Sequence, residues 1–431
     1  MAITVDSTGD LSLEEQRKLK GDLSPEEQRK LKGDLSRSLR QKKIKATLLV
    51  LPLVAFILVT FIFPIGNMLV RSVDNPQVIT YMPNVTEALK SWDGQALPDE
   101  TIYAALATDL IEGRKAKTIG KAATRLNYEK SGMRSLITGS ARKYKQIKAP
   151  YKESLIKIKK KWGDIDTWKI IKKMGTPVTA SYFINAFDME ESPDGDVSFA
   201  PEKTQIYLKL FWRTIWMSLL ITFMTVLLGY PVSFLLSSLP LKTANLLMIL
   251  VLLPFWTSLL VRTSSWIALL QTEGILNDLL VWVGVLNNEA RVQMIYNAIG
   301  TVVAMTHILL PFMILPLYSV MKTVPPSYVR AARSLGATNW TAFWKVYVPQ
   351  TIPGVSAGAI LVFILSIGYY ITPALVGGQS GRFIGNMIAY HMQSSLNWGL
   401  AAALGVMLLV MVLAIFGLYS QLVGDKKVKL G

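Results

Sequence analysis

The chain has 431 residues, 51% of them hydrophobic, and its mean hydropathy of +0.35 and long apolar runs are typical of a polytopic membrane protein rather than a soluble domain. The formal net charge of +17 favours a basic membrane protein over a nucleic-acid-binding protein, because no soluble basic reader domain stands between the apolar runs. The absence of cysteine excludes disulfides and thiolate metal sites, and the two histidines, His307 and His391, lie in separate elements, which argues against a metal cluster or a serine–histidine hydrolase.

The N-terminal tail, residues 1–45, contains a tandem repeat of twelve residues, "LSLEEQRKLKGD" followed by "LSPEEQRKLKGD". Each copy begins with a capping box, Ser12 with Glu15 and Ser24 with Glu27, and each copy ends just after a glycine. The pattern predicts two short polar helices. The tail is either a solvated duplicated segment or a docking element for a partner.

Six apolar runs are long enough to cross a bilayer, which requires roughly 20 residues of helix. The first follows a charged tail and is too long for the apolar core of a cleaved signal. The sequence therefore predicts an all-α polytopic membrane protein with six transmembrane helices. The predicted spans are Ala46–Val70, Tyr207–Leu239, Ala244–Leu270, Tyr296–Val320, Pro353–Thr372 and Gly399–Val423.

The orientation of these spans follows from Lys and Arg in the short loops, which collect on the cytoplasmic side. With the N-terminus inside, the short outer segments hold only Arg291 and Arg382. Both termini are therefore predicted to be cytoplasmic. The short inner segments hold Lys242, Lys322, Arg330, Arg333, Lys345, Lys426, Lys427 and Lys429.

The outer segment between the first and second spans, residues 71–206, is far too long for a structureless connection and should fold on its own. Its middle, from Arg114 to Lys173, is rich in lysine and carries apolar residues at helical spacing. We expect two or more helices over the outer mouth of the protein, which either contact a partner or shield the pore. A cationic substrate is not expected to bind to this lysine-rich surface, because like charges repel.

The inner loop 322–350 contains the patterned stretch "YVRAARSLGATNWTAFWKVYVPQTIPG", Tyr328–Gly354. Ala331 and Ala332 leave a helix surface that another protein can approach closely, and Gly336 suits the end of that helix. Arg330 and Arg333 are three residues apart, on one face, and suit acidic groups. Pro349 and Pro353 are expected to bracket the return into the membrane. The stretch predicts a short cytoplasmic helix that sits in a partner's groove.

The spacing within this stretch resembles the cytoplasmic signature of permease subunits of type I ABC importers: Glu-Ala-Ala, three residues, Gly, nine residues, Ile, one residue, Leu-Pro. Two further stretches, Leu253–Asn277 and Tyr369–Ile388, look like the spermidine/putrescine-type permeases. The resemblance covers roughly residues 207–425 and the first span. The matching positions are Ala331, Ala332, Gly336, Val346, Val348 and Pro349, with Arg330 in place of the glutamate.

The resemblance implies a MetI-like arrangement of six helices in the bacterial inner membrane, in which residues 207–425 form the permease core. The inner loop would be the coupling helix that enters a cleft on an ATP-binding subunit. A dimer of that subunit, a second and different permease subunit, and a periplasmic substrate-binding protein would complete the importer. ATP and Mg²⁺ would belong to the partner ATPase, since this chain has no phosphate-binding glycine loop and no cofactor is expected in it.

A path for an organic cation would use aromatic faces and carboxylates. Trp266 is alternatively an interfacial anchor, and Glu273 and Asp278 are alternatively solvated loop charges. Arg262 lies inside an apolar run and should face water, carbonyls or an acid such as Glu273 or Asp278, either as a gating group or as a static pair. His307 is expected to be an interior histidine and His391 to lie on an outer helix. The candidate path residues are Arg262, Trp266, Glu273, Asp278, Tyr369 and Tyr370.

The favoured hypothesis is therefore a permease subunit of an ATP-driven importer, forming half of a pore for a polyamine or a related solute. Similar permeases serve opines, aminophosphonates and amino-acid derivatives, and these remain alternatives. A stand-alone secondary carrier would need ion-coupling groups and usually inverted repeats, and neither is visible in the nearly uncharged spans. A membrane-embedded enzyme is disfavoured because no nucleophile, base or metal set is clustered.

Overall fold

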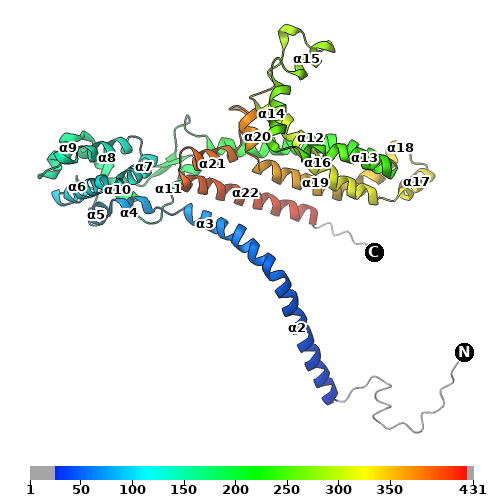
Figure 1. Cartoon of the computed structure of the whole chain (residues 1–431), viewed down its shortest axis with the longest axis horizontal. Coiled ribbons are helices and arrows are strands. Elements are labelled where there is room, and N and C mark those ends of the chain that lie inside the picture. Colours follow the sequence, from blue (N-terminus) through cyan, green and yellow to red (C-terminus); the bar gives the residue numbers. More distant parts are fainter. Residues whose placement is uncertain (1–24, 425–431) are drawn as a thin grey trace. The chain divides into compact units, whose positions relative to one another are not determined.

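Long apolar helices dominate the computed structural model, which describes residues 25–424 (Figure 1). Within these residues, five helices are long and apolar enough to cross a membrane, and a bent pair gives a sixth span if it is counted as one. The predicted all-α polytopic architecture is confirmed. The five unbroken spans are Leu39–Arg71, Tyr207–Ser238, Ala298–Thr323, Asn339–Gly368 and Trp398–Gln421.

The N-terminal helix runs without interruption through α2 (Pro25–Ile57), the π-helical turn η1 (Leu58–Ile62) and α3 (Phe63–Arg71). It passes through Gly33, so the prediction that the second repeat forms a short helix ended by this glycine is wrong. A glycine inside a helix costs only about 1 kcal/mol relative to alanine, too little to stop a helix with good helix formers on both sides. The first repeat, with Ser12 and Glu15, and the cap at Ser24 lie outside the described residues.

The segment after the first span folds into a body of short helices, as predicted. Its hydrophobic core is built around two tryptophans and a tyrosine: the Tyr103 hydroxyl and the Trp168 indole both donate to the Trp162 carbonyl, at 2.5 and 3.0 Å. The elements are α4 (Pro76–Tyr81), α5 (Pro83–Ala88), α6 (Glu100–Lys115), α7 (Ile119–Glu129), α8 (Met133–Arg142), η2 (Tyr144–Gln146), α9 (Tyr151–Ile158), η3 (Lys160–Gly163) and α10 (Ile165–Met174).

The two ends of this helical body are hydrogen-bonded to each other. Asp74 and Val178 form an isolated antiparallel bridge, in which Thr179 N donates to Val73 O at 2.8 Å and Asn75 N donates to Pro177 O at 2.9 Å. The buried apolar residues of the core all lie between Val78 and Met174. We call residues 75–177 the inserted domain, because the chain enters and leaves it at one place.

The chain then continues through α11 (Ser181–Ala186) and a hairpin of β1 (Met189–Glu191) and β2 (Val197–Phe199), with Glu190 opposite Ser198. This linker does not share the inserted domain's core. Tyr182 and Ala186 instead pack in a cluster with Phe211 of the next long helix and with Leu400 and Leu404 of the last one. Residues 179–206 therefore belong structurally with the helical bundle that follows.

Three long helices form the centre of that bundle and lie side by side in Figure 1: α12 (Tyr207–Ser238), α16 (Ala298–Thr323) and α19 (Val348–Gly368). Gly229 of α12 and Gly358 of α19 both face Met313 of α16, and a Cβ at either position would crowd that side chain. Small residues at such positions allow helices in a membrane to approach closely. The bundle is completed by α20 (Ile371–Val376), α21 (Ile384–Gln393) and α22 (Trp398–Gly424).

The predicted third span, Ala244–Leu270, is not one helix. It consists of α13 (Leu241–Leu252), the turn η4 (Leu253–Trp256) and α14 (Leu259–Leu270), and the pair of helical segments is bent by 97°. Pro254 has no N–H to continue the helix, and the Ser258 hydroxyl accepts from Val261 N at 3.2 Å to cap a new one. A short helix, α15 (Ile275–Trp282), and the turn η5 (Asn288–Ala290) follow before α16.

The fifth span also differs from its prediction. The apolar helix begins at Asn339, so Pro349 lies at the start of α19 and Pro353 lies inside it. The two prolines thus lie within a continuous helix and do not mark its start, since each removes only one backbone hydrogen-bond donor. That they bracket the return into the membrane stays a prediction. The helix ends at Gly368, before the predicted end at Thr372.

Candidate functional site

The patterned loop 322–350 forms two short helices joined by a turn, between two spans. Helix α17 (Pro326–Ser334) has a proline in its first turn, and the chain turns at Gly336 with a φ of +91°. Helix α18 (Asn339–Ala342) starts immediately afterwards, with Thr338 capping the backbone N–H of Thr341 at 3.2 Å. The predicted short helix ending near Gly336 is confirmed.

This turn presents an exposed surface with basic and apolar side chains. Arg330, Ala331 and Arg333 are exposed, and Ala332 is half-buried. Leu335, next to the turn, is 90% exposed. A leucine left in this state gains free energy when a partner covers it, and arginines provide charge for acidic groups on that partner. The surface is suited to docking.

An aromatic cluster, which was not predicted from the sequence, connects the turn to the bundle. Phe343, in the π-helical turn η6 (Phe343–Tyr347), contacts Tyr230 and Phe234 of α12 at centroid distances of 6.3 and 5.5 Å, both edge to face. Tyr347 packs on Phe234 at 5.3 Å. The predicted coupling positions Val346 and Val348 are half-buried beside this cluster, and Pro349 is exposed. The spacing of Phe343 and Tyr347, four residues apart in a helix, was the available signal.

Of the candidate path residues, the structure brings Trp266 into the bundle. Its indole N–H donates to His307 Nδ1 of α16 at 3.1 Å, and the rings meet edge to face with centroids 5.3 Å apart. Trp266 is thus held by a neighbouring helix, and His307 is the hydrogen-bonded interior histidine that we predicted. Nearby, the hydroxyls of Thr263 and Thr372 lie 3.2 Å apart and are buried.

Arg262 is one helical turn before Trp266 on α14. Of the surroundings considered for Arg262, an ion pair with Glu273 or Asp278 is not formed among the described residues. Asp278 pairs with Arg291 at 2.8 Å. The Nε of Arg262 is buried and has no hydrogen-bond partner among the described residues. Arg262 lies on α14, which ends at Leu270, whereas Asp278 lies on the following helix, α15, where Arg291 is its partner.

The remaining candidates are spread over several elements. Glu273 is exposed in the turn between α14 and α15. Tyr369 is half-buried directly after α19, and Tyr370 is exposed, with its carbonyl accepting from Asn386 Nδ2 at 2.7 Å. His391 lies on α21 as expected, bonded to the Tyr207 hydroxyl at 2.9 Å and the Ser395 hydroxyl at 2.8 Å.

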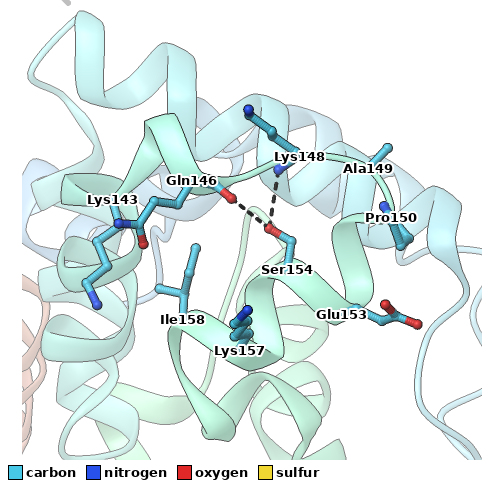
Figure 2. A pocket seen from close by; sticks show the side chains of 9 residues that line it. All are labelled: Lys143, Gln146, Lys148, Ala149, Pro150, Glu153, Ser154, Lys157 and Ile158. Carbon is cyan, nitrogen blue, oxygen red and sulfur yellow. Dashed lines mark hydrogen bonds between the residues drawn. The ribbon is translucent and has the colours of Figure 1, made fainter.

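The inserted domain carries an open hollow of about 650 Å³ between η2 and α9, lined by Lys143 and Lys157 among others. Figure 2 shows that polar groups in its lining are already hydrogen-bonded to one another: the Ser154 hydroxyl donates to Gln146 O at 3.0 Å and accepts from Lys148 N at 3.2 Å. The lining of this hollow is basic, but it has no preorganised group of side chains that would bind a ligand.

Comparison with known proteins finds a family match over the helical bundle. The family model described as "Binding-protein-dependent transport system inner membrane component" matches residues 215–428. The spermidine/putrescine transport system permease protein PotB of Haemophilus influenzae is 36% identical over 215 residues, which is 50% of this chain and 74% of that protein. The chain belongs to this family. PotB of Escherichia coli strain K12 is 33% identical over 228 residues, 52% of the permease described here and 82% of the relative.

The permease is therefore a multi-pass transport subunit of an ABC importer, as predicted, and its relatives are transport permeases rather than enzymes. The family match starts in α12, so the inserted domain lies outside it. Among solved structures, a chain of a bacterial alginate ABC transporter aligns with a TM-score of 0.41 and 18% identity, covering 50% of the permease and 78% of that chain.

Proposed function

We propose that the permease forms half of a translocation pore for a polyamine such as spermidine or putrescine, which a periplasmic binding protein delivers. The relatives named for spermidine/putrescine transport, at 33–36% identity, support this substrate class. A second, different permease subunit forms the other half of the pore. A pair of ATPase subunits holds ATP and Mg²⁺ and drives the cycle. Both termini are cytoplasmic, in agreement with the positive charge of the short inner loops.

The exposed turn between α16 and α19 is the observation that supports energy coupling most strongly. We infer that α17 and Gly336 dock in a cleft of the ATPase, with Arg330, Ala331 and Ala332 at the contact. When the ATPase subunits close, the turn moves, and the Phe343 cluster passes this movement to α12 and α19. Val346, Val348 and Pro349 hold the beginning of α19 against that cluster.

The candidate path residues are suited to a cation whose charge is balanced by few acidic side chains and mainly by aromatic rings. The described core from α12 to α22 contains three acidic residues, Glu273, Asp278 and Glu289, all on the segment that follows α14. We propose that Glu273 and Asp278 act at the mouth. Trp266, Tyr369 and Tyr370 offer aromatic faces along the path, where cation–π attraction replaces water around an ammonium. Arg262 would then act as a gate, because its charge repels a cation that approaches it.

The same Arg262 favours the alternative substrates. Its Nε has no partner among the described residues, and a carboxylate or phosphonate on an opine, an aminophosphonate or an amino-acid derivative would supply one. Uptake of labelled spermidine by proteoliposomes containing the complete importer distinguishes the two possibilities. Saturable uptake that putrescine inhibits supports the polyamine assignment; uptake of zwitterionic solutes alone would assign the alternative.

The coupling assignment is tested by substrate-stimulated ATPase activity of the assembled complex. Gly336→Val should abolish stimulation, because a β-branched residue does not tolerate a φ of +91°. Gly336→Asn is the matched control, since asparagine accepts this conformation, and it should keep most of the stimulation. Ala332→Glu should also abolish stimulation by adding bulk and charge to the contact. Normal stimulation in Gly336→Val and Ala332→Glu would remove the coupling role.

A further inference from the structure

A hollow of about 400 Å³ lies between α7 of the inserted domain and the loop that joins α21 to α22. We call it the α7 hollow. Its walls include residues from both parts of the chain, and the Tyr128 hydroxyl fixes them together by donating to Ser395 O at 2.6 Å. The hollow is therefore formed before any ligand arrives. It is lined by Gln77, Lys121, Arg125, Tyr128, Arg134 and Trp398, among others.

Arg125 is the most informative residue of this lining, because it is only 3% exposed and yet not fully satisfied. Its Nε donates to Asn75 Oδ1 at 2.7 Å, and its Nη1 donates to Glu129 Oε1 at 2.6 Å. The guanidinium lies over the ring of Tyr182, 4.5 Å from its centroid. The third nitrogen, Nη2, is buried without a hydrogen-bond partner among the described residues. A charged donor in this state calls for an acceptor.

The charges around the hollow also favour an anionic ligand. Lys121 and Arg134 line it and are exposed, and no Asp or Glu is among its lining residues. Glu129, the acid that contacts Arg125, also accepts a hydrogen bond from the Ser181 hydroxyl. Three cations therefore surround a space that contains no anion of the chain itself. An anionic group entering it gains charge-assisted hydrogen bonds.

We propose that the α7 hollow binds a carboxylate, namely an acidic side chain of the external binding protein. This inference rests on the proposed function, since it assigns a contact to the partner from which the family takes its name. A carboxylate accepts from two donors at once, which suits the exposed Lys121 and Arg134, and the buried Arg125 adds positive charge to the same lining. Because the hollow includes residues of the inserted domain and of the loop before α22, a docked side chain contacts both parts.

The test measures the affinity of the substrate-loaded binding protein for the complete importer in nanodiscs, at low and high salt. Exchanging both exposed cations, Lys121→Ala with Arg134→Ala, should weaken binding at least tenfold and make it less dependent on salt. The matched control replaces two lysines of the other basic hollow, Lys143→Ala with Lys157→Ala, and should change the affinity less than twofold (Figure 2). Arg125 is left intact because its loss would also disturb folding.

A second measurement uses the absence of cysteine from the chain. Arg134→Cys, labelled with a photo-reactive maleimide, should cross-link the binding protein, and Lys143→Cys should not. Equal affinity in the Lys121/Arg134 double variant and the wild type, together with normal ATPase stimulation in both, would overturn the site but leave the importer function intact. Failure of the wild-type complex to bind any binding protein would overturn the proposed function itself. Stabilisation by citrate in the wild type only, with unchanged partner affinity, would overturn the protein-docking assignment.

Discussion

Asp109 shows how one buried side chain organises the inserted domain. It is 2% exposed, and its carboxylate accepts three hydrogen bonds: from Asn84 N at 3.2 Å, Asn84 Nδ2 at 2.8 Å and Val85 N at 2.8 Å. It thereby satisfies free N–H groups at the start of α5 from the neighbouring helix α6. Burial nevertheless raises the pKa of Asp109 above its ordinary value, because removal from water disfavours the charged form more than these donors favour it.

Replacing Asp109 by asparagine should expose the start of α5. An amide has one acceptor oxygen where the carboxylate uses two, so at neutral pH a buried donor loses its partner, at a cost of about 1–3 kcal/mol in opening free energy. Hydrogen exchange of α5 peptides in the complete chain measures this. Asp93→Asn is the control, since Asp93 is exposed and accepts only from Gln95 N at 3.0 Å. Equal protection of α5 in both variants would contradict the role of Asp109.

The same pair of proteins should respond differently to pH. The raised pKa means that the folded state takes up a proton at higher pH than the unfolded state does. The contribution of Asp109 to the free energy of unfolding therefore rises as pH falls through the folded pKa, and it becomes constant below the ordinary pKa of about 3.9. The advantage of wild type over Asp109→Asn should widen in that window.

At the scale of elements, Phe343 is the centre of the aromatic cluster that connects the turn at Gly336 to the bundle. Phe343 contacts two aromatic residues of α12 and stacks on Tyr347 with ring centroids 5.8 Å apart. Each aromatic pair of this kind contributes about 0.5–1.5 kcal/mol. The docking surface itself, around Leu335 and Arg333, does not use these contacts.

Phe343→Ala should therefore separate docking from transmission. We expect the ATPase subunits to remain bound, while substrate transported per ATP hydrolysed falls by about tenfold, because loss of the ring leaves a cavity between the turn and α12. Phe343→Tyr keeps the ring and should retain transport. Parallel assays of ATPase activity and uptake in proteoliposomes give the ratio, and an unchanged ratio in Phe343→Ala would show that the movement takes another route.

Much of the element scale could be predicted from sequence, because long apolar runs and the Ala331–Gly336 pattern are local signals. The misses share one cause, which is that proline and glycine act according to context. Pro254 ends a helix where Ser258 can cap the next one, whereas Pro353 and Gly33 are passed by continuing helices. The surroundings of Arg262 could not be predicted because α14 ends at Leu270 and Asp278, on α15, pairs with Arg291, a contact between separate segments that no local pattern indicates.

At the scale of the whole molecule, the inserted domain and the bundle have separate cores. The apolar core of the inserted domain is complete between Val78 and Met174. The linker after it contributes Tyr182 and Ala186 to a cluster with Phe211 of the bundle. From sequence, residues 71–206 form one insertion. The division at Val178 depends on long-range contacts of the linker, so a chain-order analysis could not place it.

Two deletions should distinguish these parts. Replacing residues 76–176 by a short Gly–Ser linker keeps the Asp74–Val178 bridge, so the bundle should still assemble with its ATPase at a yield within about twofold of wild type. Removing residues 72–206 also removes Tyr182 and Ala186, and it should lower the yield of complex by about tenfold or more, since their apolar partners become exposed. Size-exclusion chromatography of the complex measures both yields. Equal losses would mean that the two cores depend on each other.

The hydrogen-bonded crossing at Asp74 and Val178 has a mechanical consequence. If a chain enters and leaves a domain at two separated points, a twist of the domain acts as opposite forces on those points. If it enters and leaves at one place, the same twist acts there as a single torque. A load on residues 75–177 that passes through the crossing therefore reaches Ser72 and Thr179 together, while the Tyr128–Ser395 hydrogen bond carries another part of it directly to the bundle. From there it acts on the end of α3 and on α11, whose Tyr182 packs against the last long helix, so a single force on the inserted domain acts on two helices at the same time.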